Sequence, residues 1–162
     1  MTADRDLTTN VDINIHYRMS TLVPFETTIE VRDACLCLHA QRAARALAKR
    51  FDAVLRPVGL TNGQFSLLMS LNRPVPPPMA PVAHLLAMDR TTLTAALKPL
   101  TRRGLVEVRV DPADQRSRLL ALTDAGRDVL ASAVPIWRGT HHDVEAALID
   151  PDTLRRELIA LA

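Results

Sequence analysis

The sequence predicts a mainly α-helical fold that carries one two-stranded β-hairpin. Apolar residues recur at spacings of three and four through most of the chain, which is the period of helices with one buried face. Only the region 106–122 changes to the alternating period of strands. The 162 residues, of which 48% are hydrophobic and 23% charged, suffice for one compact domain and exclude disorder throughout.

Residues 1–26 show no sustained period and are expected to form an N-terminal arm. A helix is predicted over 27–58, because Thr27 and Glu30 have the spacing of a capping box and Pro57 ends the pattern. Its apolar stripe consists of Cys37, Ala40, Ala44, Leu47, Phe51 and Val54. A stripe of this length requires a long partner helix.

A second capping box at 61–64 predicts a helix that ends before Pro74. Five prolines in 74–81 exclude a helix there and favour extended backbone. A short helix is expected from Pro81 to about Ala87, with proline at its first position.

Asp89 is expected to cap a longer helix that Gly104 closes, with a bend at Pro99. This helix has two faces in projection. One carries Leu93, Ala96, Leu97 and Leu100, and the other carries Thr91, Ala95, Lys98 and Arg102. One face therefore packs and the other is free.

Two strands of a hairpin are predicted at 106–110 and 119–122, joined by the turn-forming loop 111–116. Thr123 then caps a long helix with the spacing of a helix-pairing seam, bent at Pro135, and Pro151 starts a last short amphipathic helix. This order of helices and hairpin is that of a winged helix-turn-helix.

Charge is distributed unevenly in the chain. The segment 90–118 holds seven basic and three acidic residues, a net charge of +4, whereas the whole chain carries only +2. A basic segment in a nearly neutral chain is what a polyanion such as double-stranded DNA requires, although a solvated charged face gives the same count.

The helix after Asp89 has the properties of a recognition helix. Its candidate DNA-binding residues are Arg90, Thr91, Thr92, Thr94, Lys98 and Arg102. Short threonine side chains let the backbone approach base edges, and their hydroxyls and methyls can contact bases. Arg90 can reach a guanine edge or a phosphate, while Lys98 and Arg102 suit phosphates.

The hairpin loop supplies the remaining candidates. Arg116 is placed to enter a minor groove, and Asp114 can brace either its guanidinium or the loop backbone. A simple loop salt bridge is the alternative for this pair. Arg118 is expected to contact a phosphate from the strand face.

Four ordered blocks resemble the multiple-antibiotic-resistance regulator (MarR) family. They are Leu60-Thr61-x-x-Gln64-Phe65, Asp89-Arg90-Thr91-Thr92-Leu93-Thr94, Arg103-Gly104-Leu105-Val106 and the wing signature from Asp114 to Gly126. The resemblance implies an obligate homodimer with dimerisation regions at 27–58 and 123–162 and a DNA-binding lobe at 59–122. It also implies a transcriptional repressor of a pseudo-palindromic operator, released by an effector or oxidant.

Two sensing mechanisms remain open from the sequence. Cys37 lies where the hydroperoxide-responsive branch of that family keeps its reactive thiol, with Cys35 nearby, but a cysteine on an apolar stripe is usually an inert core residue. Cys35 and His39 share a helix face, so a metal-responsive regulator with His141 as a further ligand is the alternative. No resident cofactor is expected, and the small-molecule effector is not identified.

Other function classes find little support. The chain lacks the nucleophile-elbow, zinc-protease and phosphate-loop motifs, so we do not expect an enzyme. Its apolar runs are too short to cross a bilayer, and no export signal is visible. Two closely spaced cysteines do not make a secreted disulfide framework, which favours the cytoplasm.

Overall fold

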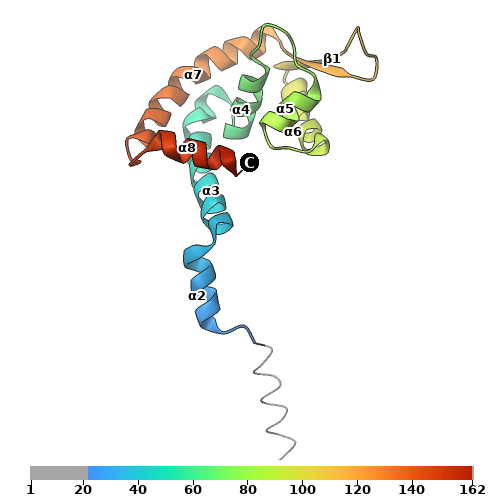
Figure 1. Ribbon diagram of the computed structural model, residues 1–162. Coiled ribbons are helices and arrows are strands. Elements are labelled where there is room, and N and C mark those ends of the chain that lie inside the picture. The colour runs from blue at the N-terminus through green and yellow to red at the C-terminus, as the bar shows by residue number, and fades with distance from the viewer. Residues whose placement is uncertain (1–21, 162) are drawn as a thin grey trace, which may run out of the picture. The chain divides into compact units, whose positions relative to one another are not determined.

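The computed structural model describes residues 22–161 (Figure 1). Along this part of the chain the elements are α2 (Phe25–Ala34), α3 (Leu36–Leu55), the 3-10 helix η1 (Arg56–Val58), α4 (Asn62–Leu71), α5 (Met79–Leu85), α6 (Arg90–Arg102), β1 (Val106–Val110), β2 (Arg118–Leu122), α7 (Asp124–Glu145) and α8 (Pro151–Ala160). Two compact units divide the chain between Ala44 and Arg45. Most of the arm expected at 1–26 lies outside the described residues, and its last two residues already belong to α2.

The first unit contains α2 and the beginning of α3. The single helix predicted from Thr27 is wrong, because the chain is extended at Cys35, with φ −73° and ψ 104°. Hydrogen bonds stabilise both sides of this break. The Cys35 amide donates to the Val31 carbonyl at 3.1 Å, and the Cys35 Sγ accepts from the Leu38 amide at 3.4 Å. The predicted capping box at Thr27 is also wrong, since α2 begins at Phe25.

The second unit begins within α3 and turns into α4 through η1. The capping box at the start of α4 is confirmed in both directions, because Thr61 Oγ1 accepts from the Gln64 amide and Gln64 Oε1 accepts from the Thr61 amide, each at 3.2 Å. Asp52 of α3 adds a further cap by accepting from the Asn62 amide at 2.6 Å. These bonds fix the start of α4 against the end of α3.

The proline-rich segment is not helical from Pro74 to Pro78, and it contacts the hairpin. The exclusion of a helix from the whole of 74–81 is wrong, because α5 begins at Met79. The Leu120 amide of β2 donates to the Pro77 carbonyl at 2.9 Å, and an antiparallel bridge joins Pro78 to Leu119. Prolines accept but cannot donate backbone hydrogen bonds, so the segment covers this edge of β2 without extending the sheet. Helix α5 starts at Met79, two residues before the predicted start.

The hairpin has the predicted strands, with Val106 opposite Leu122 and Val110 opposite Arg118. Helix α6 continues through Pro99 to Arg102 and is followed by Gly104 in the left-handed region at φ +67°. Thr123 caps α7 by accepting from the Gly126 amide at 3.0 Å. Figure 1 shows α7 as an arc, with Pro135 inside its sequence, as expected for a proline in a helix.

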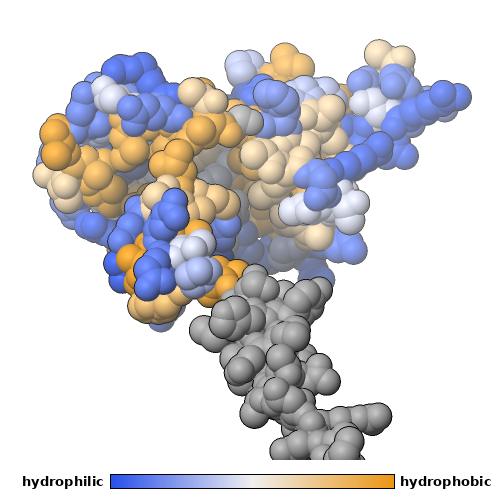
Figure 2. Space-filling model, turned by 60° about the horizontal axis from the view of Figure 1, so that its bottom comes forward, coloured by the Kyte–Doolittle hydropathy of each residue, from blue (hydrophilic) through white to orange (hydrophobic). Residues whose placement is uncertain are grey.

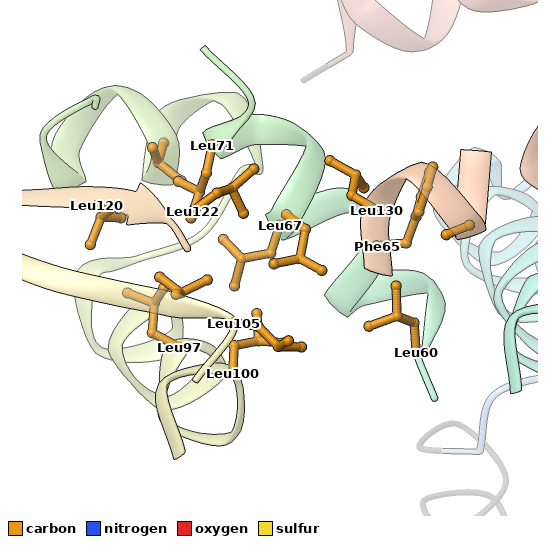
Figure 3. Close-up of a cluster of buried hydrophobic side chains, with 14 of the residues drawn as sticks. Leu60, Phe65, Leu67, Leu71, Leu97, Leu100, Leu105, Leu120, Leu122 and Leu130 are labelled. Atoms are coloured by element: carbon orange, nitrogen blue, oxygen red, sulfur yellow. The ribbon is translucent and has the colours of Figure 1, made fainter. Parts of the chain in front are cut away.

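One hydrophobic core holds α4, α5, α6, the hairpin and α7 together. Its fully buried members include Leu67, Leu68, Val82, Leu93, Leu100 and Leu120. In Figure 3 the labelled leucines of α4, α6, β2 and α7 point toward one another. Burial of each such side chain stabilises the fold by about 1.5–3 kcal/mol. The core therefore holds α6 by its buried face and leaves its other face exposed.

Candidate nucleic-acid interface

Helix α6 presents one buried and one exposed face. Leu93 and Leu100 are fully buried and Leu97 is nearly so, whereas Thr91, Lys98 and Arg102 are exposed. The division of faces predicted from the sequence is therefore confirmed. Because the leucines hold the helix rigidly, the exposed face can meet a surface such as a DNA groove without rearrangement.

The first turn of α6 is fixed by its cap. Asp89 accepts from the Thr92 amide and from the Thr92 hydroxyl, each at 2.7 Å. Both bonds hold the pKa of the Asp89 carboxyl below its ordinary value, and the bond from the Thr92 amide has the larger effect. The Thr94 hydroxyl donates to the Arg90 carbonyl at 2.7 Å. The third threonine of this turn, Thr91, has a hydroxyl that forms no hydrogen bond within the described chain.

The loop of the hairpin is held by its own carboxylates. Asp114 Oδ1 accepts from the Arg116 amide and Asp111 Oδ1 from the Ala113 amide, each at 2.9 Å. Of the two roles left open for Asp114, the structure shows the bracing of the loop backbone. The Arg116 side chain stays exposed and forms no ion pair with any described residue, so the loop salt bridge is absent there.

Arg118 has a different surrounding from the one expected for a phosphate contact. Its guanidinium donates to the carbonyls of Gln115 and Ser117, at 2.8 and 2.9 Å, and the residue is half-buried. At least one of its terminal nitrogens is therefore used to hold the loop. Sequence reasoning missed this role, because the loop carbonyls converge on Arg118 only after the loop folds.

The seven basic residues of segment 90–118 divide into two groups. Arg103 donates to the Gly59 carbonyl at 2.7 Å, Arg109 pairs with Glu107, and Arg118 holds the loop. The other four are exposed and have no side-chain partner within residues 22–161. They are Arg90, Lys98, Arg102 and Arg116. These four cations are available to bind phosphates.

A surface groove connects the start of α6 with the hairpin loop. It has a volume of about 410 Å³, and its lining includes Met79 and Ala83 of α5, Arg90 of α6, and Arg116 and Arg118 of the loop and β2. The start of α6 and the hairpin loop thus line one groove, whose charged residues are three arginines and Asp114.

The cysteine and histidine candidates lie elsewhere. Cys37 is exposed and its Sγ accepts from Gln41 Nε2 at 3.1 Å, so its placement in a buried stripe is wrong within a single chain. Cys35 caps α3, and His39 Nε2 donates to the Asp33 carbonyl at 3.1 Å. Within residues 22–161, no group of three or more His, Cys, Asp or Glu side chains is arranged to hold a metal ion.

His141 belongs to an aromatic row on the second unit. Its ring stacks on Trp137 with centroids 4.7 Å apart, and Trp137 in turn stacks on Phe65 at 6.0 Å. His141 Nδ1 lies 3.4 Å from Glu145 Oε1. Beside this row is a largely apolar pocket of about 420 Å³ whose lining includes Phe65, Trp137 and Arg138.

No helix within the described part of the chain combines the length and the apolar character that a bilayer crossing requires.

Comparison with known proteins gives a consistent result. The family model described as "MarR family" matches residues 60–117. The chain is 33% identical over 97 residues to the transcriptional activatory protein BadR of Rhodopseudomonas palustris, an alignment that covers 58% of this chain and 55% of BadR. The chain therefore spans about half the length of that curated relative.

Two solved structures resemble this chain over most of both chains. The M. tuberculosis transcriptional regulator MosR in complex with DNA has a TM-score of 0.73 and 40% identity, covering 78% of this chain and 92% of that one. The transcriptional repressor CouR bound to a 23-mer DNA duplex has a TM-score of 0.67 and 32% identity, covering 82% of this chain and 92% of that one.

Proposed function

The chain belongs to the MarR family of transcriptional regulators, and we propose that it is a homodimeric repressor that binds a pseudo-palindromic operator and is released by a small-molecule or oxidant effector. The observation that carries this proposal is the exposed face of α6 with its three unpaired cations, together with the fourth, Arg116, in the hairpin loop. The family and these structural neighbours are regulators of transcription, not enzymes. A regulator of this kind acts in the cytoplasm, where its DNA partner lies.

Each candidate side chain has a distinct role in this proposal. Thr91 reads base edges, because its hydroxyl is uncommitted and its methyl can touch thymine. Thr92 and Thr94 have committed their hydroxyl protons, so they contribute methyls and remaining lone pairs. Arg90 contacts a guanine edge or a phosphate, and Lys98 and Arg102 contact phosphates.

The wing completes the interface. Arg116 enters the minor groove, where negative potential is concentrated, while Asp114 keeps the loop in shape. Arg118 acts mainly through the loop that it holds, as a positioning residue.

The proposal of a homodimer rests on apolar surface near both ends of the described chain. Val31, Leu36 and Leu47 are 53%, 72% and 42% exposed, and Leu154 and Leu158 of α8, with Leu161 directly after it, are 38%, 48% and 71% exposed. Figure 2 shows hydrophobic surface, in orange, among hydrophilic segments. Monomeric proteins rarely leave so much apolar area uncovered. We therefore assign dimerisation to 27–58 and 123–162 and DNA binding to 59–122.

The pocket beside Trp137 is the proposed effector site. Phe65 and Trp137 offer aromatic faces, and Arg138 has no side-chain partner among the described residues. This combination fits an aromatic carboxylate, whose ring stacks on Trp137 and whose charge pairs with Arg138. The pocket is lined by α4 and α5 of the DNA-binding lobe and by α7, so a ligand there can change how these helices sit together.

The oxidant response is assigned to Cys37. Its sulfur is exposed, as a reactive thiol must be, and Cys35 is the more sheltered of the pair. Oxidation there should release operator DNA, and release by hydroperoxide that persists in Cys37→Ser would contradict this assignment.

Fluorescence anisotropy with the promoter duplex beside the protein's own gene tests DNA binding. Wild type should form a tight, sequence-selective complex, and Arg116→Ala and Thr91→Ala should each weaken it by about 1–3 kcal/mol. Lys49→Ala is the matched control, since it removes an exposed charge from α3. Equal losses in Lys49→Ala and Arg116→Ala would remove the wing from the interface.

Two further measurements test the finer points. Native mass spectrometry should give twice the chain mass of 17.9 kDa. A reporter gene behind the same promoter should become more active when the protein is deleted. A fall in reporter activity would instead indicate an activator, which is what the name of BadR describes for that protein.

A further inference from the structure

A further pocket, besides the groove beside α6 and the pocket beside Trp137, lies against the hairpin. It has a volume of about 440 Å³ and is lined by the proline-rich segment, both strands and the first turn of α7. Strand alternation places Glu107 and Arg109 on the sheet face opposite Val106, which packs in the core with the leucines of α6. The pocket shares no lining residue with the groove beside α6 or with the pocket beside Trp137.

Its lining is rich in charge, and the charges are unequally matched. Glu107 pairs with Arg109, and Asp124 pairs with Arg127. The third guanidinium, that of Arg73, has no carboxylate partner among the described residues. Its Nε donates to the Ser70 carbonyl at 3.1 Å, which orients the side chain and leaves both terminal nitrogens free.

The walls around Arg73 are fixed before any ligand arrives. Pro74 and Pro76 form one wall, and proline rings restrict the backbone. Thr123 forms another, with its hydroxyl donating to the Gly104 carbonyl at 2.6 Å and its amide to the Leu105 carbonyl at 3.1 Å. Arg127 also donates to the Leu122 carbonyl at 2.9 Å. A preformed site loses little entropy on binding.

We propose that this pocket binds a small hydrophilic molecule through a carboxylate or phosphate oxyanion held by Arg73. The free terminal nitrogens of one guanidinium match two oxygens of such a group, and guanidinium is the side chain best suited to that contact. The two existing ion pairs leave Arg73 as the uncompensated charge. The volume lies in the range of small-molecule sites. This site does not depend on the proposed DNA-binding function.

Isothermal titration of the full-length protein with inorganic phosphate, and separately with malonate, tests the proposal at constant ionic strength. We expect saturable binding of at least one anion at one site per chain. Arg73→Ala should weaken it at least tenfold and Arg73→Lys less, while Lys49→Ala should bind as wild type does. No saturable binding of either anion, or wild-type affinity in Arg73→Ala, would overturn the proposal.

Amide chemical shifts locate the bound anion. Shifts at Asn72, Glu107 and Thr123 are expected, since these residues line the pocket. Shifts confined to residues 90–94 would place the anion on the exposed face of α6 and would overturn the assignment. If the wild-type protein binds the anion but forms no complex with operator DNA, that result contradicts the DNA-binding proposal and leaves the anion-site proposal standing.

Discussion

Gly126, in the first turn of α7, lies directly against the backbone of Leu105. A Cβ at this residue would lie 2.1 Å from the Leu105 carbonyl oxygen and 3.0 Å from its carbonyl carbon. Both atoms belong to backbone that other contacts hold in place, so a small side-chain movement cannot relieve the clash. In Gly126→Ala, the first turn of α7 must instead retreat by on the order of 1 Å.

The cost follows from what that turn holds. The Thr123 amide donates to Leu105, the Thr123 hydroxyl to Gly104, and Arg127 to the Leu122 carbonyl. Overpacking of this kind costs about 1–3 kcal/mol, and each weakened hydrogen bond costs about 1 kcal/mol. Alanine returns about 1 kcal/mol through its helix propensity. We therefore expect Gly126→Ala to lower the free energy of unfolding by about 3–5 kcal/mol.

Urea unfolding followed by circular dichroism, at one fixed protein concentration, measures this loss. Gly139→Ala is the control within the same helix, because apart from its chain neighbours and the backbone of its own helix no described atom lies within 4 Å of the position its Cβ would take. It should raise the free energy of unfolding by about 0.5–1 kcal/mol. If Gly126→Ala unfolds at the same urea concentration as wild type, the close approach of α7 to Leu105 is not a real constraint.

Three further predictions follow from the same structure. Ala87 lies between α5 and α6 at φ +49°, a backbone conformation in which a Cβ costs about 1–2 kcal/mol. Because glycine also raises the entropy of the unfolded chain, Ala87→Gly should raise the free energy of unfolding by only about 0.5 kcal/mol. A lower thermal midpoint in this variant would contradict the prediction. With four free cations in each lobe of the proposed dimer, the logarithm of the operator association constant should fall with log[salt] at a slope of up to about −7. Lys98→Ala should reduce the magnitude of this slope by about 2, whereas Thr91→Ala should leave it unchanged. A flat titration in wild type would refute the phosphate contacts. Hydrogen bonds from Thr92 lower the pKa of Asp89 in the folded state. The cap therefore stabilises the fold at pH values above the unfolded pKa of about 3.9, and this stabilisation is lost as the pH falls through the lower folded pKa. The amide chemical shift of Thr92 should titrate with a midpoint below about pH 3.9 in wild type and should not titrate in Asp89→Asn.

Much of the DNA-binding lobe could be predicted because its signals are local. The caps at Thr61, Asp89 and Thr123 each need only residues within three positions, and all three are present. The alternating valines of 106–110 define a strand without knowledge of its neighbours. The buried leucines of α6 follow from helical periodicity alone.

The errors occur where distant or irregular contacts decide. The break at Cys35 interrupts a stretch with good helical periodicity, and its stabilising bond is made by a thiol, which capping rules do not include. For Cys37 the apolar stripe favours a core residue over a reactive thiol, yet the residue is exposed in the single chain. A stripe shows only that a partner is needed, and not whether the same chain supplies it. The contact of Pro77 with β2 joins residues 43 positions apart, which no local pattern encodes.

The arginines show why a count of charges is a weaker argument than their partners. Segment 90–118 has seven bases in sequence, but Arg103 and Arg118 are tied to backbone carbonyls and Arg109 to a carboxylate. Releasing them to a phosphate would leave carbonyls or a carboxylate without their donors, which offsets the gain. Arg90, Lys98, Arg102 and Arg116 carry no such cost within the described chain. In the proposed interface the electrostatic part of DNA binding therefore rests on these four residues, and replacing Arg109 with alanine should reduce the salt dependence less than replacing Lys98.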